Sequence, residues 1–289
     1  MKSGFVAILG MPNSGKSSIL NAVVGQKVSI VSKKPQTTRN RILGIYNDSE
    51  CQIVFCDTPG LIEKKTNLLA EQLAKESAQG AKDTDVSMVV IAADKGISSR
   101  EKTLIEKSSK KSKAVVVVNK VDLVDYTKLF PLLEEIGKIE GVADVVPLCA
   151  RTGKNLETLV KVLKNHLNEG EMFFAEDEVT DKSLRFMVAE LIREKALSLL
   201  NQEIPHGIFV EVEKFEEKKN AVNIEAAIIV EKDSHKAIVI GAKGGKIKDI
   251  GTRARVAIEG LMQTSVYLKL FVKVREGWRD SRAKIGELK

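Results

Sequence analysis

The sequence has no apolar run long enough to cross a membrane, and it has only three cysteines. Its longest apolar runs, 88–93 and 114–118, have the length of buried strands, whereas a membrane-spanning helix needs roughly 20 apolar residues. The cysteines are odd in number and lack the spacing of metal ligands, which indicates buried thiols in a reducing compartment. No secretory signal is present at the start, so we expect a cytoplasmic protein without a transmembrane segment.

Aromatic residues and histidines are scarce as well. Aromatic side chains make up 4% of the chain, so platforms for stacking bases are few, and the three histidines are scattered. The length of 289 residues predicts about two domains. The net charge is +7, and the part from residue 181 onward carries 21 lysines and arginines against 16 acidic residues. This basic part indicates a polyanionic partner, with a basic surface of no specific function as the alternative.

Residues 5–168 alternate strand-like and helix-like segments, which is typical of an α/β fold with a mostly parallel sheet covered on both faces. The predicted strands are 5–9, 52–56, 88–93, 114–119 and 142–148. The predicted helices are 16–24, 67–79, 99–110, 128–139 and 155–166. The turn NDSE at 47–50 predicts that one edge strand is antiparallel.

An acidic stretch at 169–180 predicts a linker between one domain at 1–168 and a smaller domain at 181–289. The second domain is predicted to contain a helix at 181–200, two strands, a glycine-rich turn, a helix ending near 262 and a last strand. The order α-β-β-α-α-β predicts a small α+β domain.

The segment GMPNSGKS, residues 10–17, matches the phosphate-loop pattern G-x-x-x-x-G-K-[ST] and follows an apolar strand. In such a loop bare backbone approaches phosphate, Lys16 reaches the outer phosphates, and the Ser17 hydroxyl ligates Mg²⁺. By itself the pattern also fits an ordinary glycine-rich turn. The residues predicted to contact a nucleotide here are Gly10, Asn13, Ser14, Gly15, Lys16, Ser17 and Ser18.

Three further motifs follow strands in order. In DTPG, residues 57–60, Asp57 can hold Mg²⁺ through water and the Gly60 amide can sense a γ-phosphate. In NKVD, residues 119–122, Asp122 accepts two donors that guanine has and adenine lacks, which rejects the wrong base by roughly 10⁴.

Asn119 is expected to brace neighbouring loops, and the stem of Lys120 to lie against the base. In CAR, residues 149–151, the Ala150 N–H can meet guanine O6. We therefore predict a guanine-nucleotide site that also includes Cys149 and Arg151.

The segment KPQTTRNR, residues 34–41, resembles the first switch of the Era GTPases, and the whole chain resembles that family. The resemblance implies a Ras-like P-loop GTPase domain followed by a type II KH domain. It implies that Thr38, or less favourably Thr37, ligates Mg²⁺ and closes over the γ-phosphate, with Lys16, Thr38 and Gly60 as catalytic residues. It further implies hydrolysis of GTP to GDP, binding to the 3′ end of small-subunit ribosomal RNA and to the 30S-type subunit, and a role in small-subunit assembly.

Leu61 stands where Ras-like proteins carry the glutamine that orients water. Attack must then be organised by backbone, metal, another residue or a partner, and unassisted turnover is expected on the order of 10⁻⁴ to 10⁻² s⁻¹. In related GTPases with this change, an asparagine in the phosphate loop helps bind K⁺, so Asn13 is a candidate K⁺ ligand. Cys149 replaces the usual serine of its motif, and we expect little consequence because the Ala150 backbone carries the contact.

The segment GAKG, residues 241–244, fits the G-x-x-G loop of KH domains. The helix after it has one apolar stripe at steps of three and four residues, with basic residues outside the stripe. Such a loop clamps about four nucleotides of a single strand, and a solvated helix start is the alternative on local evidence. The residues predicted to bind RNA are Ile240, Gly241, Ala242, Lys243, Gly244, Lys246, Lys248 and Arg253.

Two other functions stay open at this point. One is an RNA-binding scaffold whose GTP is structural and slowly hydrolysed, an alternative that Leu61 leaves open. The other is a membrane-linked cell-cycle GTPase, because the basic ending at 275–289 is a candidate for weak peripheral contact with anionic lipid at the inner face of the membrane. A solvated tail is the alternative explanation of that ending.

Overall fold

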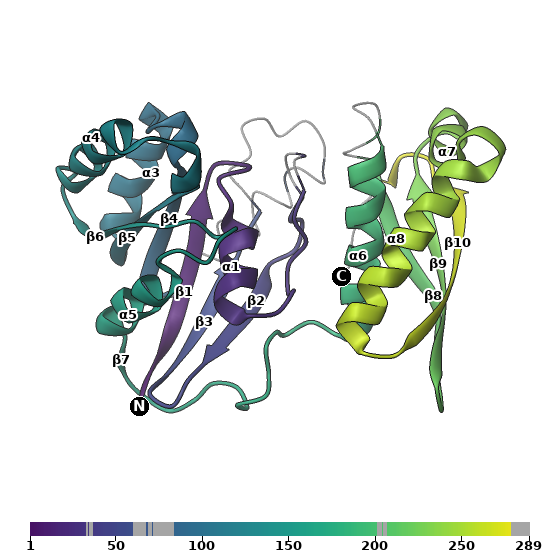
Figure 1. Ribbon diagram of the computed structural model, residues 1–289, viewed down its shortest axis with the longest axis horizontal. Helices are drawn as coiled ribbons and strands as arrows, with labels where there is room; N and C mark the ends of the chain where they lie inside the picture. Colours follow the sequence, from purple (N-terminus) through teal and green to yellow (C-terminus); the bar gives the residue numbers. More distant parts are fainter. Residues whose placement is uncertain are drawn as a thin grey trace. The chain divides into compact units, whose positions relative to one another are not determined.

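The computed structural model describes residues 1–32, 34, 37–59, 68, 71, 84–200, 204 and 207–278 of the chain. The described residues fall into two compact units. The first contains residues 1–29, 38–59 and 84–181, and the second contains the described residues of 30–37 and 64–72 and the chain from residue 182 onward. Each unit has a sheet of its own (Figure 1).

The sheet of the first unit is mostly parallel, with the strand order β2-β3-β1-β4-β5-β6. β2 is the antiparallel edge strand that the turn at 47–50 predicts, and the other pairings on this path are parallel. The carboxyl ends of the parallel strands therefore meet at one edge of the sheet. The strands are β1 (Lys2–Gly10), β2 (Ile42–Asn47), β3 (Cys51–Asp57), β4 (Val86–Ala92), β5 (Lys113–Asn119), β6 (Val142–Pro147) and the short β7 (Asn168–Glu169), which pairs with β1.

Helices cover both faces of this sheet, as the alternating sequence pattern predicts. Successive side chains of a strand point to opposite faces. Val6 and Ile8 of β1 accordingly pack with α1 and α5, while Ala7 and Leu9 pack with α3 and α4. The helical elements are α1 (Lys16–Val24), η1 (Ala93–Lys95), α3 (Ser99–Ser109), η2 (Val121–Leu123), α4 (Tyr126–Gly137) and α5 (Leu156–His166). The helix predicted at 67–79 falls almost entirely outside the described residues.

The acidic segment after β7 runs along β2 and β3. The buried side chain of Gln52 accepts from the N–H groups of Phe173 (2.7 Å) and Phe174 (3.1 Å) and donates to the Phe174 carbonyl at 2.9 Å. Farther on, the Ile45 N–H donates to the Val179 carbonyl at 2.9 Å. An uncovered edge strand can pair with other chains, and this segment occupies part of that edge.

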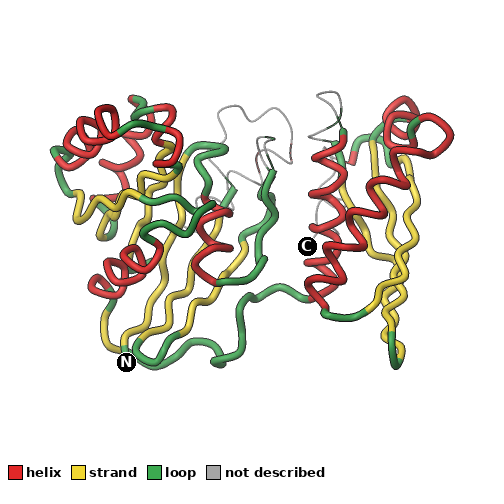
Figure 2. The backbone as a smooth tube through the Cα atoms, in the orientation of Figure 1, coloured by secondary structure: helices red, strands yellow, loops and turns green. Residues whose placement is uncertain are grey.

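The second unit has a three-stranded sheet with the order β10-β9-β8, in which β9 is antiparallel to β8 and parallel to β10. Helices α6 and α8 lie side by side and share one apolar core with the sheet (Figure 2). The order of elements is the predicted α-β-β-α-α-β. They are α6 (Leu184–Leu199), β8 (Phe209–Lys218), β9 (Ala221–Val230), α7 (Asp233–Ile240), η3 (Ala242–Gly244), α8 (Gly245–Met262) and β10 (Ser265–Val274). None of the helices in the described part of the chain is long and apolar enough to span a membrane.

Candidate functional site

The phosphate-loop pattern lies where β1 ends at Gly10 and α1 begins at Lys16. Gly15 has a φ of 102°, and a Cβ atom there would lie 2.1 Å from Nδ2 of Asn119. Only a glycine allows this turn together with this close approach. The first N–H groups of α1 have no partner within the helix and carry the positive end of its dipole, which suits phosphate oxygens.

Lys16 is buried inside this loop, with 7% of its surface exposed. Its ammonium group donates to the carbonyls of Gly10 (3.1 Å) and Met11 (3.0 Å), so the side chain curls back along the loop. Burial lowers the pKa of Lys16 from 10.5 to about 8, and the nearby Asp57 carboxylate opposes that shift. A phosphate group beside Lys16 would raise this pKa again, because its negative charge stabilises the protonated form.

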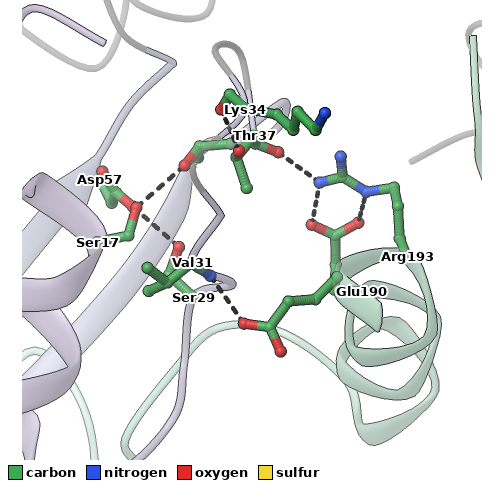
Figure 3. A network of polar contacts seen from close by, with 10 residues as sticks. Ser17, Ser29, Val31, Lys34, Thr37, Asp57, Glu190 and Arg193 are labelled. Carbon is green, nitrogen blue, oxygen red and sulfur yellow. Dashed lines mark hydrogen bonds and ion pairs between the residues drawn. The ribbon is translucent and has the colours of Figure 1, made fainter. Parts of the chain in front are cut away.

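Asp57 ends β3 and is fully buried beside the start of α1. Its Oδ2 accepts from the hydroxyls of Ser17 (2.7 Å) and Ser29 (3.0 Å) (Figure 3). Oγ1 of Thr38 lies 3.1 Å from Oγ of Ser17. Burial raises the pKa of Asp57, while the hydrogen bond from Ser17 and the charge of Lys16 lower it. Four oxygen-bearing side chains therefore meet at one place, those of Ser17 on α1, Asp57 on β3, Ser29 and Thr38.

These oxygens suit a small hard cation. Mg²⁺ prefers oxygen ligands, and it is commonly held by one or two protein groups together with water and phosphate oxygens. Within the described part of the chain, Oδ1 of Asp57 is buried without a hydrogen-bond partner, which leaves one carboxylate oxygen for such a ligand. No group of three or more histidine, cysteine or acidic side chains among the described residues could hold a metal ion, so this hydroxyl-rich cluster is the candidate.

The structure brings Thr38 rather than Thr37 to this cluster. The Thr37 hydroxyl donates to the Lys34 carbonyl at 2.7 Å, and Thr38 is buried with 7% of its surface exposed. Of the other predicted contacts, Asn13 takes a φ of 64° in the loop and Ser18 lies in the first turn of α1. Gly60 and Leu61 lie outside the described residues.

The two later motifs lie at the ends of β5 and β6 and are joined by Asn119. The buried Asn119 side chain donates to the Ser14 carbonyl at 3.0 Å and accepts from the N–H groups of Lys120 (2.8 Å) and Ala150 (3.1 Å). One side chain thus ties the phosphate loop to both base-side loops. Because the Ala150 N–H already bonds to Asn119, its contact with guanine O6 stays a prediction.

Asp122 is held by the residues of the CAR segment. The Cys149 thiol donates to Oδ1 at 2.9 Å and the Arg151 guanidinium donates to Oδ2 at 2.7 Å. The hydrogen bond from Cys149, followed by that from Arg151, lowers the pKa of Asp122 and keeps the carboxylate ionised. The Cys149 side chain thus contacts the carboxylate predicted to read the base, a contact that the sequence did not indicate, and its effect on binding stays a prediction.

The glycine-rich turn of the second unit lies between α7 and α8. Gly241 has a φ of 72°, and a Cβ atom there would lie 2.6 Å from Cβ of Lys246, so the turn and the start of α8 require a glycine. Ala242 and Lys243 are exposed, and Ile240 ends α7. The backbone of this turn and the first N–H groups of α8 are thus presented together, as a loop that clamps a phosphate backbone requires.

Positive charge on α8 is concentrated near this turn. Arg253 forms an ion pair with Asp249 at 3.1 Å, which neutralises part of its charge. Within the described residues, Lys243, Lys246 and Lys248 form no ion pair. The lysines at the start of the helix are therefore better placed than Arg253 to meet a polyanion.

Two supporting residues of the first unit carry no motif in the sequence. Ser29 donates to Asp57, and Asn21 fixes Ser29 by accepting from the N–H groups of Val28 (3.0 Å) and Ser29 (2.9 Å). Asn21 also donates to the Ser29 carbonyl at 2.7 Å. The only sequence signal was an asparagine in the otherwise apolar stretch of α1.

Comparisons with known proteins agree with this geometry. A family model described as a 50S ribosome-binding GTPase matches residues 5–120, and one described as a KH domain matches residues 203–279. A GTPase Era from Clostridioides difficile is 46% identical over 284 residues, covering 96% of this chain and 95% of the relative. A GTPase Era from Clostridium acetobutylicum is 42% identical and covers 99% of this chain and 97% of the relative.

Solved structures cover the whole chain as well. A crystal structure of a point variant of Aquifex aeolicus Era bound to GDP.AlF4- superposes with a TM-score of 0.94 at 39% identity, covering 100% of this chain and 99% of the other. A crystal structure of Era with MgGDPNP and nucleotides 1506–1542 of 16S ribosomal RNA gives a TM-score of 0.94 at 39% identity, covering 100% and 98%. With these relatives, its Ras-like GTPase domain and its KH domain, the chain belongs to the Era family of GTPases.

Proposed function

We propose that this GTPase is a switch that binds the 3′ end of small-subunit ribosomal RNA and acts in assembly of the small ribosomal subunit. The observation that carries the proposal is that one chain holds two different phosphate-facing loops. The first loop has a buried lysine and lies beside a hydroxyl cluster that suits a metal ion, and Asp122, after β5, is the proposed base-reading carboxylate. The second, at 241–244, has bare backbone and lysines alone. The relative whose crystal structure contains nucleotides of 16S ribosomal RNA supports RNA as a partner, and we assign that partner to the second loop.

The two loops divide the work between the two parts of the chain. Residues 1–168 form the GTPase domain, 169–180 the linker and 181–289 the RNA-binding domain in this proposal. The compact units support a boundary near residue 181, although the segment before it packs along β2 and β3. The 30S-type subunit is the proposed larger partner.

In the nucleotide site, Lys16 contacts the outer phosphates, and Asp122 with the 149–151 segment reads guanine. Ser17, Thr38 and, through water, Asp57 would hold Mg²⁺, which would supply positive charge beside the phosphate oxygens. The meeting of these three side chains supports that assignment, as does the MgGDPNP in a relative. Gly60, for which the γ-phosphate contact is proposed, lies outside the described residues.

Potassium is proposed to replace part of the missing glutamine function at Leu61, with Asn13 as its ligand. GTP hydrolysis is then expected to be at least about tenfold faster in KCl than in NaCl, since an arginine finger at this place is worth far more. The Asn13→Gly variant keeps the positive φ of 64° accessible but removes the side-chain oxygen, so its rates in the two salts should converge. Equal rates in KCl and NaCl for the wild type would refute the role of potassium.

The experiment that tests the proposed function is single-turnover hydrolysis of GTP with and without purified small ribosomal subunits. We expect subunits to accelerate hydrolysis by at least about tenfold over the unassisted rate, which lies on the order of 10⁻⁴ to 10⁻² s⁻¹. Large subunits at the same concentration serve as the control. An RNA-binding scaffold with structural GTP would hydrolyse GTP at the same rate with and without small subunits. That result would contradict the proposed function and support the scaffold.

Weak peripheral contact with membrane was expected from the basic ending at 275–289. Residues 279–289 lie outside the described residues, so this expectation gains no support and we attach no membrane function to the chain.

A further inference from the structure

Residues 30–37, which overlap the start of the first switch at 34–41 and are called the first-switch segment below, are held at both ends by adjacent residues of α6. The described residues of 30–37 belong to the same compact unit as α6. Near the start of the segment, the Val31 N–H donates to Oε1 of Glu194 at 3.0 Å. At its end, Nη2 of Arg193 donates to the Thr37 carbonyl at 2.5 Å (Figure 3). These two hydrogen bonds hold the backbone of the segment against α6 at Val31 and at Thr37.

Arg193 is fixed before it reaches Thr37. Its Nε donates to Oε1 of Glu190 at 2.7 Å and its Nη2 donates to Oε2 at 2.6 Å, one turn earlier on the helix. The side chains of Arg193 and Glu190 are 2% and 12% exposed. A two-point pair of this kind holds the planar guanidinium in one orientation. Arg193 therefore presents Nη2 to the Thr37 carbonyl from a rigid, water-excluded position.

A buried ion pair of this kind is weak evidence for stability alone. Desolvation of two charges often cancels their attraction, so apolar residues of similar size can replace such pairs without loss of stability. The pair here ends on the backbone of a segment that is remote in sequence, at Thr37. We therefore assign the pair the role of orienting the backbone at Thr37 rather than that of stabilising α6.

The residues that flank the segment belong to the cation-suited cluster. Ser29, just before it, donates to Asp57, and Thr38, just after it, lies 3.1 Å from Ser17. The peptide bond between Thr37 and Thr38 joins the carbonyl that Arg193 holds to the side chain that meets Ser17. Because a peptide unit is planar, fixing the carbonyl of Thr37 also fixes the direction of the Thr38 N–H and limits where Thr38 can point.

We infer that Arg193, aligned by Glu190, is a positioning residue for Thr38 and thereby for the GTP form of the nucleotide site. The inference rests on the proposed role of Thr38 as the Mg²⁺ ligand that closes over the γ-phosphate. GDP lacks that phosphate, so holding Thr38 in place favours GTP over GDP. An interaction that stabilises one of two states more than the other shifts the equilibrium between them by the difference in free energy.

The test is the ratio of affinities for a fluorescent non-hydrolysable GTP analogue and for fluorescent GDP, measured on the full chain at saturating Mg²⁺. Arg193→Met removes the charged hydrogen bond, and we expect the affinity for the analogue to fall about tenfold while that for GDP is unchanged. The Mg²⁺ concentration needed for half-maximal binding of the analogue should rise. Arg193→Lys keeps a cation but loses the two-point pair with Glu190, so its effect should be intermediate.

Arg185 provides a matched control on the same helix. Its guanidinium also donates to backbone carbonyls, those of Val212 (2.6 Å) and Glu213 (3.0 Å) of β8, and it has no contact with the first-switch segment in the described structure. Arg185→Met should lower the unfolding temperature without changing the ratio of affinities. Because the ratio is taken within each variant, a general loss of folded protein does not mimic the effect.

An unchanged ratio in both Arg193 variants would overturn the inference, as would an equal fall for GDP and the analogue or the same ratio change in Arg185→Met. If Arg193→Met does not fold, Arg193→Lys and Glu190→Gln decide in its place. A wild-type chain that binds neither nucleotide would refute the proposed function together with this inference. If the wild type prefers the analogue to GDP and the Arg193 variants have the same ratio of affinities, the inference is refuted and the proposed function is not.

Discussion

Replacing Asp122 by asparagine is expected to lower the affinity for GTP by about 10³- to 10⁴-fold and to raise the affinity for XTP. The Asp122 carboxylate has two acceptor oxygens, and its pKa is held low by the Cys149 thiol and the Arg151 guanidinium. Guanine offers two donors to such a group. An amide offers one acceptor and one donor, which suits the carbonyl that xanthine carries in place of the amine of guanine.

Competition binding of GTP, ATP and XTP against fluorescent GTP on the wild type, and against fluorescent XTP on the variant, measures this change. Asp125→Asn is the matched control, because Asp125 is an exposed residue three positions on that precedes α4 and makes no side-chain capping bond. It should leave all three affinities unchanged. A variant at Asp122 that keeps its affinity for GTP and gains none for XTP would show that another group reads the base.

Replacing Gly244 by aspartate is expected to lower the affinity for single-stranded RNA by about 10- to 100-fold and to leave GTP affinity unchanged. The turn offers backbone and lysines to a phosphate backbone, and a carboxylate among them repels phosphate. A Cβ atom at Gly244 meets no heavy atom within 4 Å, so the added side chain creates no clash. The positive φ of 75° costs some stability, although aspartate tolerates this region better than most residues.

Two controls separate charge from backbone strain. Gly244→Asn has the same shape and the same tolerance of positive φ but no charge, so it should retain most of the RNA affinity. Gly260→Asp adds the same charge near the other end of α8, where a Cβ atom also meets nothing within 4 Å, and should change RNA affinity little. Equal losses in Gly244→Asp and Gly260→Asp would indicate a general charge effect rather than a clamp at the turn.

The fold was largely predictable because the apolar runs of strands alternate with helices of regular periodicity. α1 begins and ends at the predicted residues, and the antiparallel edge strand follows from the turn before it. Strand ends were less predictable. β1 begins at Lys2 rather than residue 5, because Lys2 and Ser3 pair with β3 although neither is apolar.

Helix α7 shows a different limit. Its residues AIVI at 237–240 are apolar and the last three are β-branched, so they favour a strand as much as a helix. Tertiary packing of α7 against α8 and the neighbouring strands decides the outcome. The order of elements was predicted, but the range of this short helix was not.

The candidate nucleotide site was predictable wherever a motif stands at the end of a strand. The parallel sheet brings those ends together, as the motifs imply. Asp57 and Asn119 contact residues of the phosphate loop and the start of α1, and Asn119 and Asp122 contact the 149–151 segment. Contacts made by residues without a motif were not predictable. Ser29 and Arg193 act on residues 28 and 156 positions away, and no local pattern records such pairs.

The central claim is that one loop holds a nucleotide to be hydrolysed and the other holds an RNA strand. Ultraviolet crosslinking of the full chain, loaded with a non-hydrolysable GTP analogue, to small-subunit ribosomal RNA tests it most directly. We expect crosslinks between residues 240–248 and the single-stranded 3′ end of that RNA, and we expect Gly244→Asp to lose them while it still binds the analogue. Crosslinks that map to other residues, or that survive Gly244→Asp unchanged, would contradict the account.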